Sequence, residues 1–361
     1  MKKILALVLV AVLVMSMVAC GGPKEPKISV FWYDEADVYL SSVRTALNKE
    51  LDALGIAYDN QYAAGDQTKQ IDQIKTAIAG GSTLLIVNVV TSGSPDVAKQ
   101  ILDAAGKIPV IFFNRAIGTD GSDLEILNGN FNTCFIGTDA PEAGHMQGKM
   151  IGDYVLENYD AIDLNGDGTI SYAMMKGDEA NVEAIYRTQF GVEDANAILT
   201  AAGKPALSYF DASNPGCYQV DINGQWSAAA AKDYMDTNFV SYNEANGNMI
   251  ELVICNNDGM AEGVIASLQE KGYNKADSAH TVPVFGVDAT DNAKALIADG
   301  AMTGTVKQDA EGMAAAIAQT AKAINEGKTA TDALAALSDS RFSIAGDSKA
   351  KLFVAYAPYT G

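Results

Sequence analysis

Histidine is the scarcest reactive residue in this sequence, because 361 residues contain only His145 and His280. Zinc sites and nucleophilic triads that depend on histidine therefore have few residues to draw on. Phosphate-binding glycine motifs are missing as well: neither G-x-G-x-x-G nor a P-loop follows any apolar run, and no G-x-S-x-G elbow is present. These absences argue against nucleotide-dependent enzymes and against serine hydrolases.

Basic residues are also few. The chain has 25 Lys and Arg residues against 45 Asp and Glu residues, its net charge is -20, and the basic residues form no cluster. A nucleic-acid-binding surface needs concentrated positive charge. We therefore expect no nucleic acid among the partners.

Long hydrophobic runs are confined to the N-terminus. Lys2 and Lys3 precede an apolar run, residues 4–14, which is typical of a secretory signal. Small residues before Cys20 and two glycines after it resemble a bacterial lipobox, which predicts a signal peptide at 1–20, lipidation of Cys20 and a linker at 21–27. An ordinary signal peptide with an incidental cysteine is the alternative. No later run is long enough to span a bilayer, so we expect an extracytoplasmic protein held at the membrane by lipid alone.

Cysteine is the next scarce residue. Cys134, Cys217 and Cys255 remain after Cys20, and Cys134 and Cys255 stand in apolar, strand-like runs. This pattern favours buried thiols over a disulfide framework.

Short apolar runs alternate with amphipathic segments along the rest of the chain. The predicted strands are 28–33, 56–61, 84–89, 108–113, 135–137, 170–175, 207–211, 250–255, 282–287 and 302–306. The predicted helices are 39–54, 67–79, 95–105, 142–157, 179–201, 228–238, 261–271 and 292–299. Such alternation is typical of parallel sheets covered by helices on both faces, and the number of units predicts two doubly wound α/β domains.

One loop predicts a metal ion by its spacing alone. Oxygen-bearing side chains stand on alternate positions, with Gly168 sixth, as in an EF-hand calcium loop. These side chains are Asp163, Asn165, Asp167, Thr169 and Ser171. Position twelve, where that loop has a glutamate, is Met174, so the last carboxylate must come from elsewhere in the chain. A structural Ca²⁺ ion is the prediction, and a metal-free Asx-rich turn is the alternative.

Polar residues follow the predicted strands at the same position in both halves of the chain. They are Asp37, Asn114, residues 256–258, Asp288 and residues 308–309. Ligands of open α/β sheets bind outside the carboxyl ends of the strands. Each residue alone could simply cap a helix, but together these amides and carboxylates favour hydrogen bonding to a neutral polyol.

Six runs of the sequence resemble the bacterial galactose/glucose-binding proteins of ABC sugar importers. They are IPVIFFNR (108–115), CFIGTDAPEAGHMQG (134–148), DLNGDGTI (163–170), ELVICNNDGMAEG (251–263), VPVFGVDA (282–289) and DGAMTGTVKQDA (299–310). The resemblance implies a type I periplasmic binding protein fold, in which a three-crossover hinge joins domain 28–137 plus 309–352 to domain 138–308 plus 353–361. It also implies that Glu251 is the missing calcium ligand.

The resemblance further implies a sugar held between the domains. Its expected contacts are Asp37, Tyr39, Asn114, Asn181, Glu183, Arg187, Trp226, Asn257, Asp288 and Gln308. Asn181, Glu183 and Gln308 replace the family's His, Asp and Asn, which leaves the exact sugar open. For Trp226 the alternative is core packing, and for Glu183 and Arg187 it is a solvated helix ion pair.

We therefore expect a monomeric, lipid-anchored protein that binds galactose or glucose, serves an ABC permease and performs no catalysis. A chemoreceptor or sensor kinase is a further partner compatible with the sequence. Ribose, xylose or a furanosyl signalling ligand are alternative sugars. A sugar-responsive repressor would need an N-terminal helix-turn-helix, which is not seen, and an extracellular glycosidase would use Asp37 and Glu183.

Overall fold

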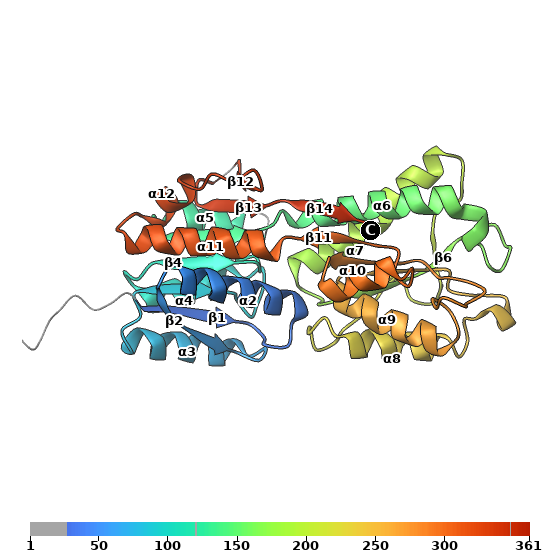
Figure 1. The fold of residues 1–361 in the computed structure, drawn as a ribbon, viewed down its shortest axis with the longest axis horizontal. Coiled ribbons are helices and arrows are strands. Elements are labelled where there is room, and N and C mark those ends of the chain that lie inside the picture. Colours follow the sequence, from blue (N-terminus) through green and yellow to red (C-terminus); the bar gives the residue numbers. More distant parts are fainter. Residues whose placement is uncertain (1–26, 120, 347) are drawn as a thin grey trace, which may run out of the picture.

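The computed structural model describes residues 27–119, 121–346 and 348–361. They form two α/β units placed end to end along the long axis of the molecule (Figure 1). The predicted signal peptide, Cys20 and nearly all of the linker lie outside the described residues.

The N-terminal unit is built on a seven-stranded sheet with the order β12-β13-β5-β4-β3-β1-β2. Its strands are β1 (Lys27–Trp32), β2 (Ala57–Tyr62), β3 (Leu84–Val87), β4 (Val110–Phe113), β5 (Thr133–Gly137), β12 (Phe342–Ile344) and β13 (Lys351–Val354). Its helices are α2 (Val38–Ala53), α3 (Gln67–Ala79), α4 (Pro95–Ala105), α5 (Ser122–Asn128), α11 (Ala310–Asn325) and α12 (Ala330–Ala335). The helices form two groups, α2 with α11 and α12, and α3 with α4 and α5. Only β12 runs antiparallel to its neighbour.

The C-terminal unit is built on a second sheet, ordered β14-β11-β10-β9-β6-β7, with β8 also paired to β6. Its strands are β6 (Ser171–Lys176), β7 (Ser208–Tyr209), β8 (Gln219–Val220), β9 (Leu252–Cys255), β10 (Val284–Asp288), β11 (Gly304–Gln308) and β14 (Tyr356–Tyr359). Its helices are α6 (Ala140–Ile162), α7 (Val182–Ala201), α8 (Ala228–Asn238), α9 (Asp258–Glu270), α10 (Asp291–Ala298) and the 3₁₀ turn Glu244–Asn246. Helices α6 and α7 pack together, as do α8 and α9.

The central strands consist of continuous apolar runs because both faces of each sheet are covered. All residues of β3 and β4 are buried, and Phe112 and Phe113 have no exposed surface. Burying one such side chain contributes about 1.5–3 kcal/mol. The same rule holds for β9, where Cys255 is a buried free thiol, and for Cys134 in β5. The prediction of buried thiols at these two positions is confirmed.

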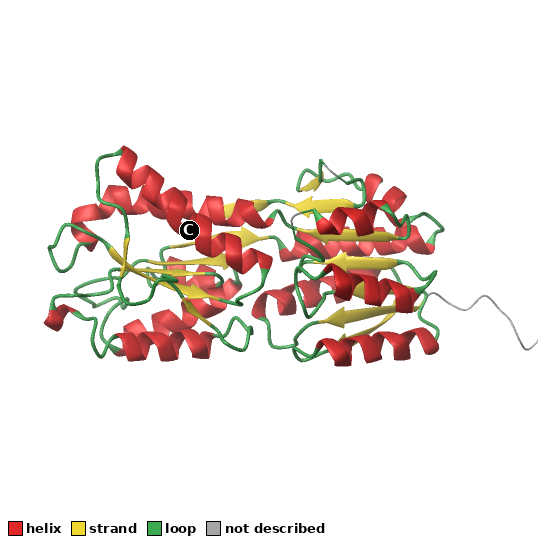
Figure 2. Cartoon of the chain, turned by 180° about the vertical axis from the view of Figure 1, so that it is seen from behind, coloured by secondary structure: helices red, strands yellow, loops and turns green. Residues whose placement is uncertain are grey.

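The chain crosses between the two units three times. The crossovers join β5 to α6, β11 to α11, and β13 to β14, and they lie side by side where the units meet (Figures 1 and 2). Two of them are tied together, because the hydroxyl group of Tyr356 donates a 2.8 Å hydrogen bond to the hydroxyl oxygen of Thr138. Both residues are buried. These connections form the hinge between the units, and this hydrogen bond couples its first and third crossovers.

Helix α6 packs against α7 through three glycines one turn apart. A Cβ atom at Gly144 or Gly148 would overlap the backbone carbonyl oxygen of Tyr186 or Phe190, and one at Gly152 would lie 2.8 Å from a side-chain carbon of Ile198. The two backbones therefore touch along almost the whole length of α7, which fixes α7 relative to α6.

The expected fold class, two doubly wound α/β domains of the type I periplasmic binding protein kind, is confirmed. Several boundaries differ from the prediction: α6 extends beyond residues 142–157 at both ends, and α7 begins at Val182 because Asn181 caps it. The elements α5 and β8 and everything after β11 were not predicted. One edge strand of each sheet, β12 in the first and β14 in the second, runs antiparallel to its neighbour. No helix within the described part of the chain is long and apolar enough to cross a membrane.

Candidate ligand site between the two units

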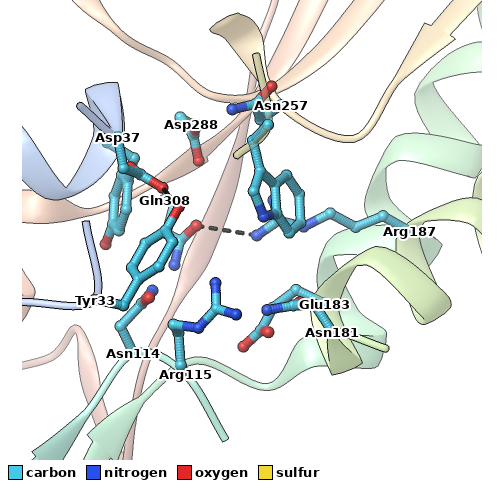
Figure 3. A pocket seen from close by; sticks show the side chains of 12 residues that line it. Tyr33, Asp37, Asn114, Arg115, Asn181, Glu183, Arg187, Asn257, Asp288 and Gln308 are labelled. Atoms are coloured by element: carbon cyan, nitrogen blue, oxygen red, sulfur yellow. Dashed lines mark hydrogen bonds between the residues drawn. The ribbon is translucent and has the colours of Figure 1, made fainter. Parts of the chain in front are cut away.

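A cavity lies where the two units face each other. It is lined by Tyr33, Asp37, Tyr39, Asn114, Arg115, Asn181, Glu183, Arg187, Trp226, Asn257, Asp288 and Gln308 (Figure 3). All ten residues expected to contact a sugar are therefore in one place, although their role in binding stays a prediction. Sequence reasoning missed Tyr33, the last residue of the predicted strand 28–33, and Arg115, two residues after the predicted strand 108–113.

Asp37 is held by two hydrogen bonds on the N-terminal side of the cavity. One carboxylate oxygen caps α2 by accepting from the backbone N–H of Leu40 at 2.8 Å, and the other accepts from the hydroxyl group of Tyr33 at 2.7 Å. Burial raises the pKa of Tyr33 well above its usual value, and the charge of Asp37 adds to the effect. Asp37 therefore caps a helix and lines the cavity at once, so the two interpretations of this residue do not exclude each other.

Tyr39 and Asn114 complete this side. The Tyr39 ring is buried, and its hydroxyl group contacts the sulfur atom of Met313 at 3.7 Å. Asn114 adopts a left-handed backbone conformation, with φ 58°, and its side-chain oxygen accepts a 3.3 Å hydrogen bond from Asn88. The Asn88 amide also donates to the carbonyl oxygen of Phe113 at 3.1 Å. A buried amide beneath the cavity thus fixes the turn that presents Asn114.

Helix α7 supplies the opposite wall. Asn181 caps the helix by accepting from the backbone N–H of Ala184 at 3.1 Å, and Glu183 and Arg187 follow one turn apart. Both charged residues are buried, at 6% and 3% exposure, so the alternative of a solvated surface pair is wrong.

Arg187 connects the cavity to the hinge. Its guanidinium group donates to the carbonyl oxygen of Asn256 at 2.9 Å, to the side-chain oxygen of Gln308 at 3.0 Å (dashed in Figure 3) and to the hydroxyl oxygen of Tyr356 at 3.2 Å. Tyr356 belongs to the third crossover, so the cavity wall and the hinge share one hydrogen-bond network.

Several buried polar atoms around the cavity have no hydrogen-bond partner in the part of the chain that the structure describes. They are Nε of Arg115, Nε of Arg187, Oε2 of Glu183 and Nε2 of Gln308. Unsatisfied buried groups are rare and costly in native proteins. Burial raises the pKa of Glu183 above its usual value, and the nearby Arg187 charge offsets part of this rise. A ligand with several hydroxyl groups would satisfy such a set of donors and acceptors.

Trp226 forms part of the wall next to α8. Its backbone is left-handed, with φ 57°, and a Cβ atom at Gly177 would overlap its ring. The following residue, Ser227, caps α8 and donates its backbone N–H to Asp221 at 3.0 Å. The Arg187 guanidinium carbon lies 5.7 Å from the ring centroid. Neighbouring backbone and caps therefore hold the indole ring at the cavity.

Asn257 and Asp288 close the C-terminal side. Asn257 caps α9 by accepting from the backbone N–H of Met260 at 2.9 Å. Asp288 has a φ of 128° and is followed by Ala289 at 54°, an uncommon backbone path for residues other than glycine. Burial raises the pKa of Asp288 well above its usual value, while Arg187 lowers it.

The loop 163–171 is closed by a buried glutamate from a distant part of the chain. Glu251, directly before β9, accepts from the backbone N–H groups of Asn165 at 3.1 Å and Ser171 at 2.9 Å. The Asp163 carboxylate accepts from three backbone N–H groups, including that of Gly168 at 2.9 Å. The Asp167 carboxylate accepts from the backbone N–H of Thr169 at 2.8 Å.

The negative charges at the loop 163–171 bear on whether it can bind a metal ion. No group of three or more His, Cys, Asp or Glu side chains in the described residues is arranged as a metal site. The ion pairs found in this part of the molecule nevertheless leave Asp163, Asp167 and Glu251 without a Lys or Arg partner. Two carboxylates of the loop, the Glu251 carboxylate beside it and several neutral side-chain oxygens are the types of donor that a hard cation prefers, so the residue types present fit Ca²⁺.

Comparison with known proteins agrees with this fold. The family model described as periplasmic binding protein domain matches residues 28–329, and the chain belongs to that family. It is 32% identical over 311 residues to the D-galactose/methyl-galactoside binding periplasmic protein MglB of Haemophilus influenzae, a match that covers 84% of this chain and 82% of the relative. It is 25% identical over 315 residues to the multiple sugar-binding periplasmic protein SbpA of Azospirillum brasilense, covering 85% and 77%.

Solved structures share the architecture. A solute-binding protein from Bacillus halodurans with bound myo-inositol has a TM-score of 0.64 and 24% identity, and the match covers 86% of this chain and 92% of that one. A solute-binding protein from Clostridium phytofermentans with bound β-D-glucose has a TM-score of 0.64 and 21% identity, covering 92% and 94%. These likenesses support the fold class.

Proposed function

We propose that this protein is an extracytoplasmic binding protein that captures a hexose, galactose or glucose, between its two units and delivers it to an ABC permease. The observation that carries the proposal is the wall of the interdomain cavity, where three aromatic residues, Tyr33, Tyr39 and Trp226, accompany a set of amide, carboxylate and guanidinium groups. The galactose-binding relative, which the chain matches over most of its length, supports the choice of sugar.

The chemistry of a pyranose matches this wall. Its C–H faces suit aromatic rings, here Tyr39 and Trp226, and its equatorial hydroxyl groups suit polar partners around the edge. Charge-assisted hydrogen bonds to Asp37 and Arg187 are stronger than neutral ones. A site of this kind rejects ligands that leave its buried polar groups unpaired. Closure of the hinge is favoured by ligand because both units contribute contacts to the same cavity.

Another monosaccharide or a cyclitol is the second candidate. Gln308 supports it, because its side-chain oxygen is already used by Arg187 while its Nε2 has no partner. The cavity therefore offers a donor at this position. Relatives and structural neighbours named for several sugars, and one with bound myo-inositol, make this alternative concrete.

The experiment is a thermal-shift screen of the mature protein against galactose, glucose, ribose, arabinose and myo-inositol, followed by calorimetry on each ligand that raises Tm. A ligand that binds only the folded state raises Tm by mass action. A larger shift with a hexose than with the other ligands supports the proposal. No shift with either hexose and a shift with myo-inositol or a pentose would replace it with the second candidate. An enzyme that used Asp37 and Glu183 would instead hydrolyse a supplied glycoside and lose that activity in Glu183→Gln.

We also propose that the loop 163–171 holds a structural Ca²⁺ ion. Its ligands would come from Asp163, Asn165, Asp167, Thr169, Ser171 and Glu251. The buried Glu251 carboxylate already joins the two ends of this loop, and the ion would neutralise the carboxylates gathered there. The Ser171 hydroxyl group donates to the carbonyl oxygen of Met249, so its oxygen would act with that bond in place.

Anchoring and partners complete the proposal. Lipidation at Cys20 would hold the mature chain at the cell membrane, where it would present the closed, loaded form to the permease. A chemoreceptor or sensor kinase would recognise the same closed form. In Cys20→Ser we expect loss of metabolic fatty-acid labelling and release from the membrane fraction. A labelled, membrane-bound variant would contradict the anchor.

A further inference from the structure

Arg115 and Asp178 form an ion pair that joins the two units. Arg115 lies two residues after the end of β4, and Asp178 lies two residues after the end of β6. Their Nη2 and Oδ2 atoms are 3.3 Å apart, and the two side chains are 6% and 22% exposed. No other ion pair found among the described residues connects the N-terminal unit to the C-terminal unit away from the crossovers.

Arg115 is otherwise tied to its own unit. It donates to the carbonyl oxygen of Val90 at 3.0 Å, and its guanidinium carbon lies 4.2 Å from the centroid of the Tyr33 ring. Tyr33 in turn hydrogen-bonds Asp37. The Nε atom of Arg115 is buried without a partner, and the residue lines the cavity. One guanidinium group thus faces both the ligand space and the opposite unit.

Asp178 is tied to the C-terminal unit. Its Oδ1 atom accepts from the backbone N–H of Ala180 at 2.9 Å. Gly224, in the segment 214–225 that precedes Trp226, packs against it, and a Cβ atom at Gly224 would lie 3.3 Å from Oδ2 of Asp178. The glycine has a φ of 63°, so other residues would be strained there. This segment therefore packs on the carboxylate that faces Arg115 and contributes to its partial burial.

We propose that Asp178 is a positioning residue for ligand binding, which acts by pairing with Arg115 across the boundary between the two units when they close. This inference rests on the proposed function as a ligand-capturing protein. Opening the hinge separates the two side chains, so the pair exists only in the closed form. An interaction made only in the closed form raises the closed fraction, and apparent affinity rises with that fraction.

The test compares Asp178→Asn with Glu179→Gln as the matched control. Glu179 is the adjacent acid, but it pairs with Lys176 and Tyr218, both in its own unit. In Asp178→Asn we expect galactose or glucose to bind roughly 3- to 10-fold more weakly, between the effects of exposed and buried charge pairs. Stopped-flow measurements should place the change in the dissociation rate. Glu179→Gln should stay within about twofold of wild type. Equal effects of the two variants would overturn the proposal.

A double-mutant cycle separates pairing from ligand contact. Arg115→Gln removes a cavity group as well as the pair, so it should weaken binding on its own. If Asp178 acts through Arg115, adding Asp178→Asn to Arg115→Gln should cost little more, and Asp178→Glu should restore part of the affinity. Full additivity of the two losses would show that Asp178 acts by another route.

A ligand-free measurement distinguishes failure of this inference from failure of the proposed function. Single-molecule energy transfer between dyes on the two units counts the closed fraction without sugar. We expect it to be several-fold smaller in Asp178→Asn than in Glu179→Gln. If no hexose binds the wild type, the proposed function fails while this measurement still decides on the pair. Equal closed fractions, including none in either variant, would overturn the inference.

Discussion

The hydroxyl group of Thr305 donates a 2.6 Å hydrogen bond to the carboxylate of Asp258 beneath the cavity, and both residues have no exposed surface. The second carboxylate oxygen accepts from the backbone N–H of Thr290 at 2.8 Å. The Thr305 hydroxyl oxygen also accepts from the backbone N–H of Ala289 at 3.3 Å. This pair therefore holds the left-handed turn that presents Asp288 to the ligand.

Replacing Thr305 tests this support. Thr305→Val keeps the shape but leaves an Asp258 oxygen and the Ala289 N–H unpaired, so we expect sugar affinity to fall about 5- to 30-fold, the equivalent of about 1–2 kcal/mol. Thr305→Ser, which keeps the hydroxyl group, should stay close to wild type. Calorimetric titration measures both. Equal affinities for the two variants would show that the turn holds its shape without this hydrogen bond.

Asp258 should also make stability depend on pH. Burial raises the pKa of Asp258 to about 7, above the ordinary value of an aspartate. A raised pKa means that the folded state binds the proton more tightly, so this contribution to the free energy of unfolding is complete below about pH 4 and is lost as pH rises through about 7. Asp288, Glu262 and Cys255 are titratable groups that interact electrostatically with it.

Urea unfolding of wild type and Asp258→Asn between pH 5 and pH 8 measures this effect. We expect the wild type to lose more stability than the variant over this interval, because only the wild type must ionise the buried carboxyl. Other groups titrate in both proteins and cancel in the difference. Parallel pH profiles would contradict a raised pKa at Asp258.

Trp226→Ala should weaken sugar binding by a few kcal/mol at most, because the sugar loses one of its two aromatic stacking partners while its polar contacts remain. Trp226→Phe should recover much of the affinity. Because the indole ring is 8% exposed and packs on Gly177, its fluorescence should also change when wild type binds sugar. Normal affinity in Trp226→Ala would remove the aromatic platform from the proposed site.

Glu251→Ala tests the calcium proposal. We expect the variant to melt at a lower temperature than wild type in calcium, because it lacks one ligand of the ion. The difference should shrink in chelator, because chelator removes the ion from both proteins. Glu157→Ala, on the exposed face of α6 shortly before the loop, is the matched control. A loss of the same size with and without chelator would mean that Glu251 closes the loop only through its hydrogen bonds to Asn165 and Ser171.

Periodicity was sufficient to predict most of the two sheets, because buried parallel strands such as β4 and β9 consist of continuous apolar residues. It did not reveal α5, which has seven residues, or β8, which has two. The antiparallel strands β12 and β14 depend on where the crossovers bring the chain back, and local sequence carries no signal of that.

The cavity residues that were predicted either follow strands or resemble those of a known family. The ones that were missed act through tertiary contacts. Tyr33 looked like the last residue of a buried strand, and only the structure shows its hydroxyl group on Asp37. Asp258 and Thr305 support the cavity without lining it. They lie far apart in sequence and meet because β11 runs beside β10, which α9 covers. The sequence spacing of these two residues does not predict their hydrogen bond.

The glycine contacts between α6 and α7 bear on how the protein moves. Helix α6 begins directly after the first crossover, and α7, pressed against it at Gly144 and Gly148, carries Asn181, Glu183 and Arg187 at its first turns. When the chain rotates at this crossover, α6 and α7 therefore move as one rigid body, and these three side chains move with them. A bulkier residue at Gly148 would re-aim all three together, without touching any of them.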